Sequence, residues 1–586
     1  MSIESKKDWR EVFLQGALIA GLLLAGGTEL LSAFHGLTRE GVFLFWVLAA
    51  GVCFLRLLLR QNFRGIDLNL GGFQRWEMAM LVILAVLAVA LWVQGFLSAP
   101  NTFDSMVYHL SRVMHWAQAK SIEFYPTSIR RQLWMPPLAE YGVLHLYLLT
   151  GSDRLAFLMQ WGAYIGCMFT ASLIAGILGV DRRGQVAAAA MAAALPMAVL
   201  QGVSTQTDLV AAFWGMQAVA WFLLWLRRGF PWFEAVCGAA ALALGVLTKM
   251  SVLVVCPLIA GVVILSMRAL CFRRIIGLLL MIMAVVGVVN SAHFARVYGY
   301  FHTCNPAATE DRLTREDHGL AAFMAVGIRN AALNWTTSSD RVNGLIRTGV
   351  DRACRWLGVD ANDPRFNLAP GDVYLKKVHV FYESRAPGGL HFWLGVFVLA
   401  LVLIRWRSFG VIVTVYVLAL VVGFVLLCIL MKWQPWGMRF QLPLFLLGVP
   451  LLALVAARLD ARGRLIKMLA GLFVFLVIPV VVFNSMHPWV GGNAFYVLPR
   501  EDQYFLSAPE KKIFFTKVVD EIVRAQCFSV GLAWQGAESW EYPLWAMLRA
   551  RGMRVVVRDV KAADGLPVDA AVFKPCLVIG HEGVLP

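Results

Sequence analysis

Charged residues are scarce in this chain of 586 residues: only 15% are Asp, Glu, Lys or Arg, whereas 59% are hydrophobic. An ordinary soluble domain carries about 25% charged residues. The mean hydropathy is +0.68, and repeated apolar stretches are about 17–25 residues long, enough to cross a bilayer as helices. The composition therefore excludes an ordinary soluble domain and indicates a polytopic membrane protein.

Three familiar motifs are also missing. None of the 10 cysteines forms a CxxC pair, so no zinc site is indicated. The glycine-containing stretch 531–536 in the tail lacks the helix context of a phosphate-binding loop, which argues against nucleotide binding. The first apolar segment, 12–33, has no small-residue cleavage site, so we expect a retained span rather than a signal peptide.

The net charge of +16 does not indicate nucleic-acid binding, because many of the basic residues lie in short loops between apolar segments. Lys and Arg accumulate in the cytoplasmic loops of membrane proteins. The residues in such loops are Arg56, Arg60, Arg64, Arg75, Arg182, Arg183, Arg227, Arg228, Arg268, Arg273, Arg274, Arg405, Arg407, Arg458, Arg462, Arg464 and Lys467.

The hydropathy pattern predicts about thirteen transmembrane helices. We place them at about 11–33, 41–59, 77–97, 155–178, 185–203, 207–226, 233–248, 251–269, 274–292, 389–405, 409–431, 438–457 and 464–485. With Lys6, Lys7 and Arg10 in the cytoplasm, every basic short loop falls inside and every long polar segment falls outside. We therefore expect a multi-pass membrane protein with a cytoplasmic N-terminus and an exported C-terminus.

The predicted division of the chain is a transmembrane domain, 1–486, with external loops 98–154 and 293–389, followed by a periplasmic domain, 487–586. Pro136 to Thr150 is apolar but short, and we expect a helix at the outer interface there, because a further span would invert all later loops. Within the second loop, 341–357 predicts a short amphipathic helix.

The tail alternates strand-like and helix-like segments, which predicts a small α/β domain with a parallel sheet. Cys304 and Cys354 fall in one external region, and Cys527 and Cys576 in the other. Export would permit disulfides in both regions, although the spacing fixes no pairing.

A polar face near the start of the first external loop is the strongest candidate for chemistry. Asp104, Tyr108 and Arg112 follow one another at intervals of four residues, which would align them on one side of an α-helix, and His115 continues the face. His109 is a further candidate beside it. The alternative is an interfacial amphipathic helix with a solvated polar side.

Further basic groups lie at predicted outer boundaries. Arg130 and Arg131 precede a Pro-rich turn and would suit a phosphate, or lipid headgroups. Lys249 lies in a hairpin between two spans, where a lysine either snorkels or meets a lipid phosphate. Arg439 begins a late span, where a charge tends to be functional. Asp208 begins another span, either as a helix N-cap or as part of a site.

Several of these stretches together resemble integral-membrane polyprenyl-phosphate-sugar glycosyltransferases. The group in question is glycosyltransferase family 39, with the protein O-mannosyltransferases and the aminoarabinose transferases. Asp104 with Tyr108 matches the acidic residue and tyrosine of the family's first external loop. Pro136-Pro137-Leu138 is similar to its Pro-containing turn, Leu247-Thr248-Lys249 to its hairpin, and Arg439 to Pro443 to its Arg–Pro pair.

The resemblance covers about residues 77–445 in order. This sequence departs from the pattern at Ser105, where many relatives carry a second acidic residue. No basic residue directly precedes Pro136, so Arg130 or Arg131 would have to act as the phosphate ligand there. The external tail is not general to the family.

The resemblance implies a GT-C fold, to which the tail adds the small external α/β domain predicted above. It also implies an inverting transfer of sugar from a polyprenyl-phosphate carrier to an exported hydroxyl-bearing glycan, lipid or protein. Asp104 would be the general base. Tyr108, Arg112, Arg130, Arg131, Lys249 and Arg439 would bind the donor or its phosphate, with His109 and Asp208 as possible additions. No cofactor beyond the lipid-linked donor is expected and no metal ligand set is indicated, although a divalent metal stays open, and membrane lipids are the remaining partners. The implied location is the bacterial inner membrane, with the C-terminus in the periplasm.

Two other classes remain open at this stage. A transporter or flippase for a lipid-linked sugar would carry inverted repeats and broken helices at mid-membrane depth. A non-catalytic envelope assembly protein would use its exported tail to bind a partner, and would not depend on Asp104.

Overall fold

The computed structural model describes residues 8–59, 72–309, 312–368, 380–534, 538–561, 573–580 and 583–585. Lys6 and Lys7, assigned above to the cytoplasm, lie outside the described residues. So do Arg60 and Arg64 of the first basic loop.

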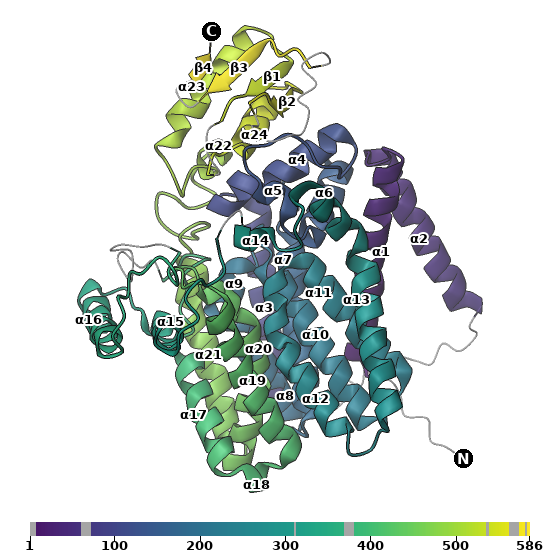
Figure 1. The fold of residues 1–586 in the computed structure, drawn as a ribbon, viewed down its shortest axis with the longest axis vertical. Helices are drawn as coiled ribbons and strands as arrows, with labels where there is room; N and C mark the ends of the chain where they lie inside the picture. The colour runs from purple at the N-terminus through teal and green to yellow at the C-terminus, as the bar shows by residue number, and fades with distance from the viewer. Residues whose placement is uncertain are drawn as a thin grey trace.

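Most of the described chain is a bundle of long apolar helices (Figure 1). In this part of the chain, eight helices are long and apolar enough to cross a membrane. They are α1 (Trp9–Ala33), α3 (Arg75–Leu97), α7 (Leu158–Ile177), α10 (Asp208–Arg227), α13 (Phe272–Phe301), α19 (Val411–Leu430), α20 (Met438–Leu459) and α21 (Arg464–Val482). The prediction of a polytopic helical membrane protein is confirmed.

The count of thirteen spans is not confirmed, although a helix occupies each predicted position. The remaining five positions hold α2 (Arg39–Leu59), α8 (Arg182–Ala193) with α9 (Pro196–Gln201), α11 (Trp232–Thr248), the 3₁₀ turn η2 (Met250–Val255) with α12 (Cys256–Ser266), and α17 (Leu390–Ile404). The break between α8 and α9 has a local cause. Leu195 is extended, with ψ of 118°, because the residue before a proline avoids the helical region.

Helix α10 forms the centre of the bundle. In its most apolar window 94% of the residues are buried, whereas only 28% are buried in α3 and 17% in α13. Many of the large exposed side chains of α3 and α13 are aliphatic, such as Val86 and Val288, and suit contact with lipid. A polar group at the end of α10 is therefore held by helices on all sides.

The two ends of the bundle carry different elements. The short helix α18 (Trp406–Phe409), next to Arg405, lies at the end of the bundle opposite the C-terminal sheet (Figure 1). Helices α4 (Leu110–Ala119), α5 (Arg131–Trp134) and α6 (Leu138–Thr150) lie on the sheet's side. We call this second end the outer end. Helix α6 has only 13 residues, in keeping with the expected interfacial helix.

The tail forms the predicted small α/β domain. The described strands are β1 (Ser529–Leu532), β2 (Val556–Asp559), β3 (Leu577–Gly580) and β4 (Gly583–Leu585), in the order β2-β1-β3-β4. Strand β1 pairs in parallel with β2 and β3, and β4 adds an antiparallel edge. Helices α22 (Arg500–Gln503), α23 (Lys511–Arg524) and α24 (Tyr542–Ala550) accompany the sheet.

Only one of the two possible cysteine pairs forms a disulfide. Cys527 and Cys576 are bonded, which ties the segment before β1 to the segment before β3. Cys304 is free and exposed, and Cys354 is free and buried, so a disulfide between these two is contradicted.

The second external region is largely helical. It contains α14 (Pro306–Thr309), α15 (Leu320–Ala332), the 3₁₀ turn η3 (Leu333–Trp335) and α16 (Asp340–Trp356). Helix α16 confirms the amphipathic helix predicted at 341–357.

Candidate active site

Four of the predicted residues meet at the outer end of the bundle, although they come from distant parts of the sequence. Asp104 precedes the π-helical turn η1 (Ser105–His109). Asp208 begins α10, Lys249 follows the last residue of α11, and Arg439 is the second residue of α20. Because four elements end at the same level, their terminal side chains share one small volume.

An ion pair between Asp104 and Arg439 lies at the centre of this cluster. Oδ2 of Asp104 accepts a hydrogen bond from Nη1 of Arg439 at 2.5 Å, and the side chains are only 13% and 8% exposed. Burial acts to raise the pKa of Asp104, but the charge of Arg439, with those of His109 and Lys249, outweighs it and holds that pKa well below its usual range. Asp104 is therefore ionised at neutral pH.

A second ion pair lies beside the first. Nζ of Lys249 donates to Oδ1 of Asp208 at 2.5 Å, and Oδ2 of Asp208 lies 4.0 Å from Nη1 of Arg439. The Asp208 side chain is 1% exposed. Its carboxylate therefore bridges two cations. The N-cap role that the sequence left open for Asp208 is contradicted, because the N-cap of α10 is Thr207.

Two glutamines that sequence reasoning missed complete this network. Oε1 of Gln206 accepts from Arg439 at 3.1 Å, and Nε2 of Gln201 donates to Asp208 at 3.2 Å. Both are buried polar residues at the edge of an apolar segment, which was the signal available in the sequence.

Ser105 fixes the position of Asp104 relative to Asp208. Its buried hydroxyl lies 2.5 Å from the hydroxyls of both Thr102 and Thr205. The serine that departs from the family's acidic pattern therefore joins η1 to the segment that leads into α10.

Arg112 does not share the face of Asp104, so the predicted alignment of these two side chains is wrong. In η1 the amide of Leu110 donates to the carbonyl of Ser105, five residues back, so the turn is wider than an α-helical turn. The wider turn rotates the later side chains away from Asp104. Nη1 of Arg112 instead donates to Oε1 of Glu140 at 3.0 Å, and His109 contacts the same oxygen at 2.7 Å.

The Arg112 guanidinium holds the Pro-rich loop in place. Its Nε and Nη2 donate to the carbonyls of Gln132 and Met135 at 2.9 and 2.8 Å. The contacts with Glu140 and Gln132 are buried and the contact with Met135 is partly buried, so Arg112 positions this loop. Its role in donor binding stays a prediction. His115 likewise lies off the Asp104 face, against Glu541 at 3.3 Å.

Tyr108 and Arg131 pack against each other near Asp104. The Arg131 guanidinium lies over the Tyr108 ring, 5.5 Å from its centre, and forms an ion pair with Glu538 of the tail. Burial and the Asp104 carboxylate raise the pKa of Tyr108 well above 10, so its hydroxyl stays protonated. Arg130, next to Arg131, is half-buried, and its place near a ligand stays a prediction.

Glu383, in the loop before α17, is a further acid that the sequence did not single out. Its carboxyl group is 1% exposed, and burial raises its pKa to about 7, against the effects of Ser384 and Arg439. Within the described chain, its Oε2 has no hydrogen-bond partner. A single glutamate in a polar loop would be predicted to be solvent-exposed, so the burial of Glu383 becomes evident only in the fold.

Glu383 predicts a pH-dependent stability. Its pKa is raised above the ordinary 4.5, so ionisation of the folded protein costs free energy as pH rises from 4.5 to about 7. The shift corresponds to about 3 kcal/mol. The variant Glu383→Gln should match wild type in thermal stability near pH 4.5 and exceed it increasingly up to pH 7. A stability difference that does not change with pH would contradict this assignment.

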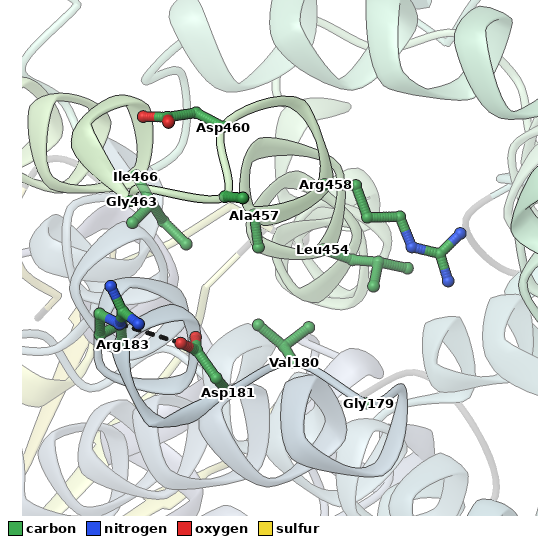
Figure 2. A pocket seen from close by; sticks show the side chains of 11 residues that line it. Gly179, Val180, Asp181, Arg183, Leu454, Ala457, Arg458, Asp460, Gly463 and Ile466 are labelled. Atoms are coloured by element: carbon green, nitrogen blue, oxygen red, sulfur yellow. Dashed lines mark hydrogen bonds and ion pairs between the residues drawn. The ribbon is translucent and has the colours of Figure 1, made fainter.

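A separate cavity at the opposite end of the bundle is not part of this cluster. It has a volume of 270 Å³ and lies between the α7–α8 and α20–α21 connections (Figure 2). Asp181 pairs with Arg183 at 3.0 Å, Asp460 accepts three backbone amides, and Arg458 donates to the carbonyl of Ser408. Its charged groups already have partners in the protein.

Neither protein-family models nor curated protein sequences match this chain. The solved structures similar to it include two of ArnT from Cupriavidus metallidurans. The one bound to undecaprenyl phosphate has 13% identity and a TM-score of 0.45, and the apo structure has 12% and 0.46. Each comparison covers 81% of this chain and 85% of the other. At these values the likeness assigns no substrate to this chain and no role to any residue.

Proposed function

We propose that this chain is a GT-C-type glycosyltransferase that moves a sugar from a polyprenyl-phosphate carrier to an exported hydroxyl-bearing acceptor. The observation that carries the proposal is the contact of Asp104 with Arg439, beside Asp208 and Lys249, at the outer end of the bundle. A base and two cations therefore lie together at the outer boundary of the membrane. A lipid headgroup and an exported acceptor can both reach this boundary. The motifs that resemble family 39 contain Asp104, Lys249 and Arg439.

Arg439 has the hydrogen-bonding capacity that a phosphate needs. Its Nη1 donates hydrogen bonds to Asp104 and Gln206, whereas its buried Nε has no hydrogen-bond partner within the described chain. Lys249 donates to Asp208, and its ammonium group has three donors. Both cations can therefore donate a hydrogen bond to an anionic oxygen in addition to their present partners.

The reaction follows from these groups. The acceptor hydroxyl gives its proton to the Asp104 carboxylate, and its oxygen attacks the anomeric carbon from the face opposite the phosphate. The bond between that carbon and the phosphate oxygen breaks, and the electron pair leaves with polyprenyl phosphate. Arg439 and Lys249 neutralise the growing negative charge, which is commonly the larger catalytic contribution.

The donor also makes Asp104 a better base. While paired with Arg439, Asp104 is ionised but weakly basic, because its pKa is held low. A phosphate beside Arg439 would offset part of the guanidinium's charge and raise the pKa of Asp104. Proton removal is thereby favoured only when the donor is bound.

The neutral phenol of Tyr108 is suited to hydrogen bonding with the sugar, and Arg131, packed on its ring, would hold that phenol in place. Arg130 would add positive charge at the same turn. We place the site on the periplasmic side of a bacterial inner membrane, with the N-terminus in the cytoplasm, following the distribution of basic loops.

Purified protein in lipid nanodiscs, given radiolabelled undecaprenyl-phosphate sugars and a membrane extract, tests the proposal. We expect the label to move to an acceptor in the extract while undecaprenyl phosphate is released in equal amount. Nanodiscs have no enclosed lumen, so a flippase would leave the label on its carrier. An assembly protein would also leave it there, and either outcome would refute the proposal.

A further inference from the structure

The exported C-terminal domain makes direct contact with the turn that carries Asp104. The backbone amide of Glu541, at the start of α24, donates to the carbonyl of Met106 within η1 at 3.1 Å. On the same side, the rings of Phe103 and Trp540 lie 6.4 Å apart, and Trp540 stacks on Phe505 at 6.1 Å. The domain therefore packs against the residues on both sides of Asp104.

Gln132 joins η1 to the Glu541 side chain. Its Nε2 donates to the carbonyl of Val107 and to Oε2 of Glu541, both at 2.9 Å. Its Oε1 accepts from the hydroxyl of Tyr125 at 2.8 Å. Both amide protons of Gln132 are thus used, one on each side of the interface.

Glu541 is fully enclosed at this interface. Its side chain is inaccessible to solvent, and Oε2 also lies 3.3 Å from Nε2 of His115. Removal of one member of a buried polar network leaves the others without partners, which costs more than the net strength of one hydrogen bond. Loss of the Glu541 carboxylate would therefore take this partner from both the Gln132 amide and the His115 ring.

From these contacts we propose that Glu541 and Gln132 are positioning residues, through which the exported domain holds η1 and so sets the direction of the Asp104 and Tyr108 side chains. A π-helical turn is rare and closes wider rings than an α-helix. The carbonyls of Met106 and Val107 receive donors from outside the turn, and Ser111 Oγ adds a further one to Met106 at 2.9 Å. The tail is then part of the active centre and not an independent appendage.

The catalytic consequence rests on the proposed function, but the structural part can be measured without any substrate. Hydrogen–deuterium exchange of the full-length protein should show faster exchange for peptides covering 104–111 in Glu541→Ala than in wild type. We expect an increase of about tenfold or more, since a charged hydrogen-bond acceptor is lost from a buried site. Glu541→Gln, which retains an acceptor oxygen, should restore part of the protection.

Two further variants separate positioning from general damage to the domain. Glu501→Gln removes a surface ion pair with Arg551 in the same domain and should leave exchange of η1 at the wild-type rate. Gln132→Met removes the bridging amide from the other side and should reproduce the effect of Glu541→Ala on η1. Gln132→Met also decides the matter if Glu541→Ala does not fold.

Sugar transfer supplies the second measurement. In Glu541→Ala and Gln132→Met we expect kcat to fall by a larger factor than the KM for the lipid-linked donor rises, because the phosphate ligands Arg439 and Lys249 are untouched whereas Asp104 is misdirected. Unchanged exchange of η1 in both variants would overturn the proposal whatever the activity. Faster exchange in a protein that transfers no sugar even as wild type would instead count against the proposed function alone.

Discussion

Replacing Asp104 with asparagine is expected to lower the rate of sugar transfer by at least about a hundredfold, because a positioned general base contributes about 10²–10⁴ to a rate. Asparagine has nearly the same shape and can still accept a hydrogen bond from Arg439, so the fold should persist. The measurement is the initial rate of label transfer from the lipid-linked donor by purified protein.

Glu123→Gln is the matched control for this variant. Glu123 lies in the same external loop, but it is exposed and lies outside the Asp104 cluster. Its rate should equal that of wild type. An Asp104→Asn protein that transfers sugar at the wild-type rate would exclude Asp104 as the base and favour the assembly-protein class.

Removal of the Glu140 carboxylate is expected to destabilise the protein by about 3–5 kcal/mol, since one partner of a buried ion pair is left alone. Glu140 is 2% exposed and contacts both Arg112 and His109. Burial acts to raise its pKa, but these two neighbours outweigh it and lower the pKa to about 2. The stabilisation is therefore present above pH 4.5 and is lost only as pH falls towards 2.

A double-mutant cycle measures this pair directly. Glu140→Leu and Arg112→Met should each be strongly destabilising, whereas the double variant should be far less so than their sum, because neither charge is left unpaired. Thermal unfolding in detergent at pH 7 gives the four values. Strictly additive effects would show that Arg112 does not depend on Glu140, and would favour its predicted role at the donor site.

The sequence was a good guide to the ends of helices and a poor guide to irregular backbone. Asp208, Lys249 and Arg439 stand at the boundaries of apolar segments, where a charge is conspicuous, and the fold brings all three together with Asp104. Hydropathy also located a helix at every predicted span position. It could not locate the break at Leu195, which depends on one proline.

Arg112 shows why the contacts of the other site residues could not be predicted from the sequence. Spacing by four residues implies a shared face only if the helix is regular, and η1 is not. Its wider turn depends on contacts with Gln132 and Glu541, which lie 25 and more residues away in sequence. Glu383 was missed for a similar reason: its burial comes from the packing of a loop, and a loop carries no periodicity.

The binding of undecaprenyl phosphate to wild type and two variants tests most directly whether Asp104, Lys249 and Arg439 act on one lipid-linked donor. Lys249→Met should weaken this binding by about tenfold or more, because a cation is lost from a phosphate site. Asp104→Asn should bind at least as tightly as wild type, since a repelling carboxylate is removed, and yet transfer sugar at least about a hundredfold more slowly. If Asp104→Asn lost affinity as Lys249→Met does, or if neither variant changed it, the three residues would not form one donor site.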